Sequence, residues 1–166
     1  TDGQVLTSTG AGSPPVFEDA GGGVNTPAFE ATLSSAFVFS NQTPTKVQFD
    51  TESFDTDSCY DNSTNYRFTP TIAGKYYVYT SLKQNPTGSS NLTSCNAHIY
   101  KNGVQISDFG IGVASTNVFS ATGSRVVELN GSTDYVEIYV YQNTSGTPQI
   151  EGDYNRSFFG AYKIIE

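Results

Sequence analysis

The chain has 166 residues, of which 36% are hydrophobic and 13% aromatic, with 11 Tyr, 11 Phe, no Trp and no Met. Sixteen acidic residues against 8 basic ones give a formal charge of -8, which leaves no basic stripe for phosphates and excludes nucleic acid as an expected partner. No apolar run approaches the roughly 20 residues of a spanning helix, so we expect no membrane insertion. Because the chain begins at Thr1 and contains no methionine, we expect it to be a processed part of a longer polypeptide.

Residues 1–26 are predicted to form a collar and a joint. The apolar pairs Val5-Leu6 and Val16-Phe17 flank a loop rich in Gly, Ser and Pro, which predicts a short β-hairpin. A lone hairpin is marginal in water, so these side chains are expected to bury against the same segment of neighbouring chains. The run Gly21-Gly22-Gly23 predicts a flexible joint before the head domain.

The head, residues 27–166, is predicted to be all-β, because short strand-forming segments alternate with polar turns. Val47 and Phe49 alternate with polar residues, as in a half-buried strand. Asn102-Gly103 predicts a tight hairpin, since both central residues of such a turn need positive φ. A second pair, Asn130-Gly131, is expected to end a strand. The expected strands lie at 27–31, 46–50, 60–61, 65–79, 97–101, 104–106, 125–129, 135–141 and 157–162.

In this order the segments resemble the heads of the C1q/tumour-necrosis-factor superfamily. The resemblance runs from Pro27 onward and includes the stretches 60–79, 98–103 and 157–162. It implies a two-sheet jelly-roll sandwich that assembles as a homotrimer and binds ligands without catalysis. One departure is the loop 131–134, where the family commonly has a tighter Gly-Asp pair.

The N-terminal segment is similar to modules that precede globular tips in fibre and appendage proteins of marine tailed phages. It reads Asp-Gly-Gln-Val-Leu-Thr-Ser over residues 2–8. The resemblance implies a virion structural protein on the particle surface, joined through its collar to other virion proteins. Such a trimeric head of a tail or head fibre would bind a saccharide or protein on the host surface. The alternatives are a capsid decoration protein and a secreted complement-like or cytokine-like binding module.

Large rings occupy both faces of the strand that begins near Gly74. Tyr76 lies on one face, with Tyr77 and Tyr79 on the other, and only one face can belong to the core. A monomer rarely exposes a large aromatic patch, and the resemblance places this strand in the sheet around a threefold axis. We therefore predict that Tyr77, Tyr79 and Tyr162 lie at a homotrimer interface. The alternative is an open sheet with the tyrosine hydroxyls in water.

A second set of tyrosines, Tyr135, Tyr139 and Tyr141, shares one face of a strand that the resemblance places in the outer sheet. We predict that these rings bind the ligand, because rigid aromatic side chains often anchor recognition. The alternative is cross-strand aromatic pairing that stabilises the sheet. The polar loops 84–94 and 142–151 are further candidates for recognition.

No catalytic constellation is expected. The single histidine, His98, lies mid-strand with no Gly-x-Ser-x-Gly elbow in the chain, so we predict a packed or surface residue and no enzyme. Cys59 and Cys95 leave open whether a disulfide forms. Six Asn-x-Ser/Thr sequons are interpreted as chance products of the composition.

No cofactor or metal site is predicted, and calcium is the one cation to consider. Asp55, Asp57 and Asp61 place carboxylates on alternate positions, but the segment lacks the central glycine and terminal glutamate of a helical calcium loop. The alternative is an ordinary solvated acidic turn.

Overall fold

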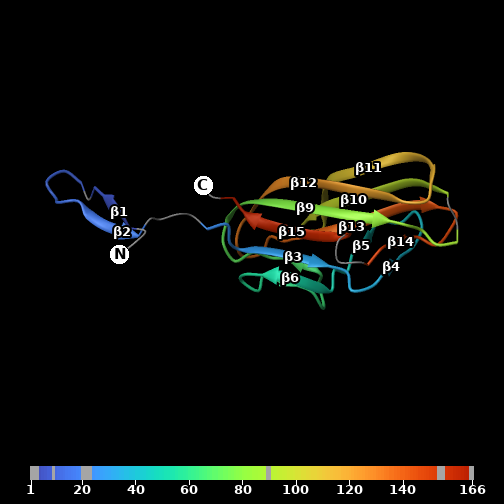
Figure 1. Cartoon of the computed structure of the whole chain (residues 1–166), viewed down its shortest axis with the longest axis horizontal. Helices are drawn as coiled ribbons and strands as arrows, with labels where there is room; N and C mark the ends of the chain where they lie inside the picture. The colour runs from blue at the N-terminus through green and yellow to red at the C-terminus, as the bar shows by residue number, and fades with distance from the viewer. Residues whose placement is uncertain (1–3, 9, 20–23, 89–90, 153–155, 165–166) are drawn as a thin grey trace.

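The structure is a computed structural model that describes residues 4–8, 10–19, 24–88, 91–152 and 156–164. Within these ranges all regular secondary structure is β, in a short hairpin and a two-layered sandwich (Figure 1). The described residues contain no helix long and apolar enough to cross a membrane.

The N-terminal segment forms the predicted hairpin. Strand β1 (Gln4–Thr7) pairs antiparallel with β2 (Val16–Asp19), and Leu6 lies directly opposite Phe17. The side chains of Leu6 and Phe17 are 60% and 69% exposed. The hairpin therefore leaves apolar surface uncovered in a single chain. The predicted joint, Gly21 to Gly23, lies outside the described residues.

One layer of the sandwich is the β9 sheet, in which the strands follow the order β4-β14-β9-β15-β3-β6 and β12 pairs with β9. Its strands are β3 (Ala28–Thr32), β4 (Phe37–Val38), β6 (Thr51–Asp55), β9 (Gly74–Gln84), β12 (Phe119–Leu129), β14 (Gln149–Ile150) and β15 (Phe158–Lys163). The long antiparallel pairing of β9 with β12 and β15 makes β9 the centre of this layer.

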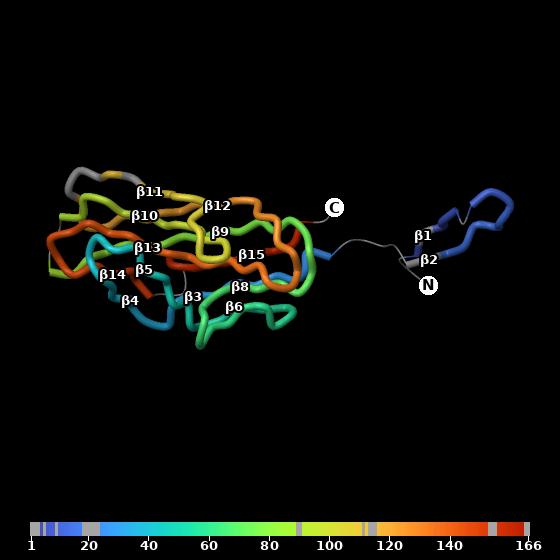
Figure 2. The backbone as a smooth tube through the Cα atoms, turned by 180° about the vertical axis from the view of Figure 1, so that it is seen from behind, coloured from blue at the N-terminus to red at the C-terminus, as the bar shows by residue number. Residues whose placement is uncertain are grey.

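The other layer is the β10 sheet, with the order β11-β10-β13-β8-β7 and β5 paired with β13 (Figure 2). Its strands are β5 (Thr45–Lys46), β7 (Tyr60–Asp61), β8 (Arg67–Phe68), β10 (Leu92–Lys101), β11 (Val104–Thr116) and β13 (Val136–Thr144). The turn between β10 and β11 has φ of 52° at Asn102 and 77° at Gly103, which confirms the predicted tight hairpin.

The core lies between the two sheets and is rich in aromatic rings. Phe29 of β3 stacks on Tyr60 and on Phe68, each at 4.6 Å between ring centroids, and meets Phe159 edge-on at 4.8 Å. Phe29, Phe68 and Phe159 are fully buried, and Tyr76 joins them through an edge contact with Phe68. Because these rings come from both layers, their contacts hold the sandwich together.

The segment 46–50 differs from its predicted strand. Val47 and Phe49 are fully buried and Gln48 and Asp50 are exposed, so the predicted alternation is confirmed. The strand ladder, however, stops at Lys46. The reason is that the chain leaves β13 here and crosses to the other layer, where it forms β6.

The loop at Asn130-Gly131 also joins the two layers, because β12 belongs to the β9 sheet and β13 to the β10 sheet. The side-chain oxygen of Asn130 accepts hydrogen bonds from the backbone N–H groups of Ser132, Thr133 and Asp134. Gly131 has φ of 69° and passes so close to the backbone of Ala73 that a Cβ atom would lie 2.2 Å from its nitrogen. This turn therefore requires glycine.

Cys59 and Cys95 are both buried and both free. The possible disulfide is thus not formed. Two sequon asparagines serve the fold: Asn41 exchanges two hydrogen bonds with the backbone of Thr144, and the Nδ2 of Asn130 donates to Thr133. These bonds favour the chance interpretation of the sequons; Asn155 lies outside the described residues.

Candidate binding surfaces

The three tyrosines predicted for an interface lie together on the outward face of the β9 sheet. Ring centroids are 5.4 Å apart between Tyr77 and Tyr162, 6.1 Å between Tyr77 and Tyr79, and 6.4 Å between Tyr79 and Tyr162. Phe158 adds a fourth ring, 6.1 Å from that of Tyr79. We call Tyr77, Tyr79, Phe158 and Tyr162 the tyrosine patch.

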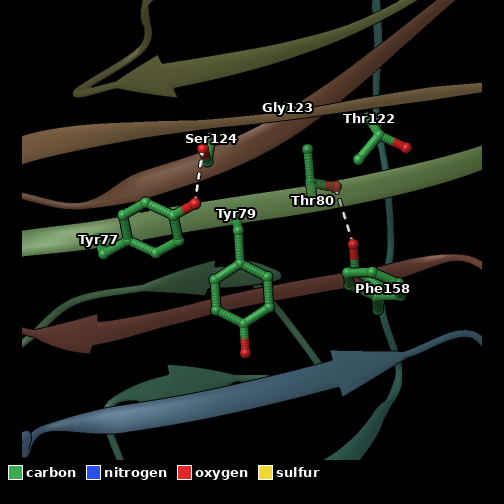
Figure 3. A pocket seen from close by; sticks show the side chains of 7 residues that line it. All are labelled: Tyr77, Tyr79, Thr80, Thr122, Gly123, Ser124 and Phe158. Atoms are coloured by element: carbon green, nitrogen blue, oxygen red, sulfur yellow. Dashed lines mark hydrogen bonds between the residues drawn. The ribbon is translucent and has the colours of Figure 1, made fainter.

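Strand alternation and neighbouring polar groups position the tyrosine patch. Tyr76 and Val78 point into the core, which sends Tyr77 and Tyr79 to the other face. The hydroxyl of Tyr77 donates to Ser124 Oγ at 2.8 Å (Figure 3). The hydroxyl of Tyr79 donates to Glu30 Oε2 at 3.1 Å. Both hydroxyls are therefore bonded to protein groups.

The hydroxyl end of the Tyr79 ring lies over Gly160 of the adjacent strand β15. A Cβ atom on Gly160 would come within 2.4 Å of this ring. Because glycine has no side chain, the ring of Tyr79 can pack directly against the backbone of β15. Partial burial and the neighbouring Glu30 carboxylate raise the pKa of Tyr79 well above its ordinary value. Tyr79 is thus held neutral and in place before any partner binds.

A shallow hollow of about 390 Å³ adjoins the tyrosine patch and opens on the same face. Its lining residues are Tyr77, Tyr79, Thr80, Thr122, Gly123, Ser124 and Phe158 (Figure 3). Beside it Val126 of β12, paired directly with Tyr77, is 48% exposed. The face therefore combines aromatic rings, an exposed aliphatic side chain and a concave surface without charged lining.

In the second set, Tyr139 and Tyr141 lie on the outward face of the β10 sheet, on β13, and Tyr135 directly precedes this strand. The guanidinium carbon of Arg67 lies 4.3 Å from the ring centroid of Tyr135. Tyr139 stacks on Tyr100 of β10 at 4.0 Å between centroids. The side chain of Tyr141 makes no hydrogen bond or ring contact with any other described residue. Among the described residues, one of the three rings thus has no polar or aromatic partner.

Sequence reasoning identified the rings but not their partners. Tyr100 and Arg67 were missed, because stacking and cation–π contacts depend on which strands adjoin β13 and in which register. The ion pair between Lys46 and Glu137, at 2.9 Å, was missed for the same reason. The signal that was present, alternation along β13, defines a face and not its neighbours.

His98 is buried on the same sheet, 3.4 Å from a carboxylate oxygen of Asp108. Burial lowers the pKa of His98, and the negative charge of Asp108 opposes this shift. Its Nδ1 has no partner in the described part of the chain. The arrangement is that of a packed neutral histidine, in agreement with the sequence-based interpretation.

The acidic residues considered for calcium bind their own loops. Asp55 accepts from the backbone N–H groups of Asp57 and Tyr60, and Asp61 accepts from those of Ser63, Thr64 and Asn65. These bonds hold the pKa of Asp61 far below its ordinary value. Among the described residues no three His, Cys, Asp or Glu side chains gather as a metal site.

Solved structures share this fold. Murine APRIL aligns with a TM-score of 0.61 and 9% identity over 82% of this chain and 98% of that chain. The globular domain of zebrafish complement 1qA protein aligns with a TM-score of 0.56 and 14% identity, over 85% and 99%. Eiger TNF from S. frugiperda aligns with a TM-score of 0.58 and 14% identity, over 84% of this chain and 92% of that chain.

These likenesses confirm that the chain is a C1q/TNF-like jelly roll. At such identities they concern the fold alone. The sequence matches no protein-family model and no curated protein.

Proposed function

We propose that the chain is the homotrimeric head of a virion appendage and that it binds receptors on the host surface. The observation that carries the proposal is the tyrosine patch. Four large rings on an outward sheet face, with Tyr162 still 37% exposed, form an apolar surface that association would remove from water. The proposal assigns this face to the contact between copies of the chain.

The hairpin supports assembly independently. Leu6 and Phe17 expose most of their side-chain surface on a ribbon too small to be stable alone. Three copies brought together by their heads would place three hairpins side by side, where these residues can bury against one another. The same collar is the proposed joint to other virion proteins, in line with its similarity to phage appendage modules.

The layered fold suits an adhesive head. The tyrosine patch belongs to the β9 sheet, whereas Tyr139 and Tyr141 belong to the β10 sheet and Tyr135 directly precedes its strand β13. If the β9 sheets face one another, the β10 sheets face outward and offer three equal binding surfaces. Linking weak sites in this way raises avidity by roughly 10² to 10⁴ without new contacts.

The proposal predicts that Val126→Glu separates the trimer and abolishes adhesion. A carboxylate at this position would be buried without a partner in the interface, a penalty of several kcal/mol, about 3 or more. We expect the variant to fold as a monomer and to bind a panel of marine bacteria at least about 100-fold more weakly than the wild type, because linked sites are lost. Flow cytometry with labelled chain measures the binding.

Val104→Glu is the matched control. Val104 is 66% exposed and follows the Asn102-Gly103 turn of the β10 sheet, so the added charge stays in water. The control should remain trimeric and adhesive. A wild-type chain that adheres to no cell in the panel, or a Val126→Glu variant that adheres as well as the wild type, would contradict the proposal.

A further inference from the structure

Tyr141 lies in an uncharged polar neighbourhood on the outward face of the β10 sheet. The strand register places Asn96 directly opposite Tyr141, and Ser94 opposite Asn143. The side chain of Gln42 reaches Asn143, with Nε2 donating to Oδ1 at 3.1 Å. We call these five residues the Tyr141 patch.

Hydrogen bonds within the patch fix its polar groups. Ser94 Oγ donates to Asn96 Oδ1 at 3.1 Å, and the backbone N–H of Gln42 donates to the carbonyl of Gln142 at 2.9 Å. The carbonyl of Asn143 accepts a bond from Thr93 at 3.1 Å. A surface held in this way loses little conformational entropy when a ligand binds.

The lack of charge around the patch is a property of long stretches of sequence. Residues 31–45, 84–100 and 138–150 contain no Asp, Glu, Lys or Arg, although the whole chain has 24 such residues. The structure brings parts of these three stretches together, because Gln42, Ser94 and Tyr141 come one from each. The sequence order gives no sign of this convergence.

The one charged group bonded to the patch, among the described residues, is negative. Asn96 Nδ2 donates to Asp108 Oδ1 at 2.8 Å, and this carboxylate also lies near His98. The next charged groups along β13 neutralise each other, as Glu137 is paired with Lys46 at 2.9 Å. Together with the net charge of -8, this arrangement disfavours an anionic ligand.

We propose that the Tyr141 patch is a binding site for an uncharged saccharide. The ring offers an apolar face for the C–H side of a pyranose, while the amides of Asn143 and Gln42 and the hydroxyl of Tyr141 offer donors and acceptors for sugar hydroxyls. This site rests on the proposed function, since it names the class of receptor that the adhesive head binds.

A panel of immobilised oligosaccharides tests the site with the full chain. The panel holds neutral hexose and N-acetylhexosamine oligomers beside sialylated and sulfated oligomers of equal length. We expect binding to neutral members only. Tyr141→Ala should weaken it on the order of tenfold or more, as expected for loss of a central aromatic anchor. Binding to the anionic members alone overturns the proposal.

Two further variants keep the test sharp. Val104→Ala shortens a side chain that is 66% exposed just after the Asn102-Gly103 turn of the same sheet, and should bind as the wild type does. Asn143→Asp keeps the oxygen that accepts from Gln42 but adds a charge, and it should weaken binding to the neutral oligosaccharides. This variant tests the site independently of whether Tyr141→Ala folds. Unchanged binding by Asn143→Asp overturns the site.

The adhesion assay separates the two proposals. A trimeric chain that adheres to bacteria, whose adhesion neither Tyr141→Ala nor excess neutral oligosaccharide reduces, overturns the saccharide site and leaves the adhesive head intact. A chain that adheres to no cell overturns the proposed function itself.

Discussion

Single residues in this sandwich acquire their properties from the layer they face. Tyr60 and Tyr79 show the contrast. Burial in the core raises the pKa of Tyr60 strongly, and its hydroxyl donates to the carbonyl of Phe49. Tyr79 lies on the outward face, where contact with Gly160 and a hydrogen bond to Glu30 hold its ring in place. An outward ring that is already ordered gives up little entropy in an interface.

The buried His98 makes stability depend on pH. Its folded-state pKa lies below its ordinary value of 6.5, so between these two values the unfolded chain binds a proton that the folded chain does not. The contribution of neutral His98 to the free energy of unfolding is complete above pH 6.5. It is lost as the pH falls from 6.5 toward the folded-state pKa, by at most about 1.4 kcal/mol per pH unit. Urea unfolding at pH 7.5 and 5.5 should show this loss.

A His98→Gln variant provides the comparison, because it retains a polar side chain that does not titrate. We expect its unfolding free energy to change less between the two pH values than that of the wild type. Equal pH dependence in the two proteins would show that His98 does not contribute.

At the level of strands, local sequence patterns predicted which side chains face outward better than they predicted how long each strand is. Alternation around Tyr77 and Tyr79 and the Asn102-Gly103 turn are local signals, and the structure agrees with both. Strand β11 extends to Thr116, whereas the sequence predicted an end near Ile106. The prediction stopped early because the Gly, Ala and Ser residues beyond Ile106 are weak strand formers. Pairing with β10 nevertheless keeps this segment extended.

The points where the chain crosses from one sheet to the other could not be predicted from local sequence patterns, because they depend on strand pairing. Residues 47–50 alternate as a strand would, but they cross between sheets, and only the pairing of both flanking strands reveals it. The stacking of Tyr139 on Tyr100 likewise depends on long-range register. Such contacts decide which of the three outer tyrosines has no polar or aromatic side-chain partner in the ranges that the structure describes.

The loop from Asp55 to Asn65 gives a prediction about metal removal. Its carboxylates already accept backbone N–H donors, so the loop is closed by its own hydrogen bonds and not by a cation. We expect an excess of chelator to leave the melting temperature unchanged, and added calcium to have no effect. A fall of several degrees with chelator that calcium reverses would establish a metal site.

At the scale of the whole molecule, the two outward faces of the sandwich differ in chemistry. The β9 sheet presents rings, Val126 and a hollow without charged lining. The β10 sheet presents amides, hydroxyls and one tyrosine whose side chain has neither a hydrogen bond nor a ring contact within the described part of the chain. Apolar surface favours contact between identical copies, and fixed polar groups favour recognition of a hydroxylated ligand. One sandwich can therefore use one face to assemble and the other to bind.

Sedimentation equilibrium of the full chain at micromolar concentration tests the central claim most directly. The account predicts a single species with three times the mass of the 17.8-kDa chain, and one chain mass for Val126→Glu under the same conditions. A wild-type protein that sediments at 17.8 kDa would contradict it, because the tyrosine patch would then lie open to water in the folded protein.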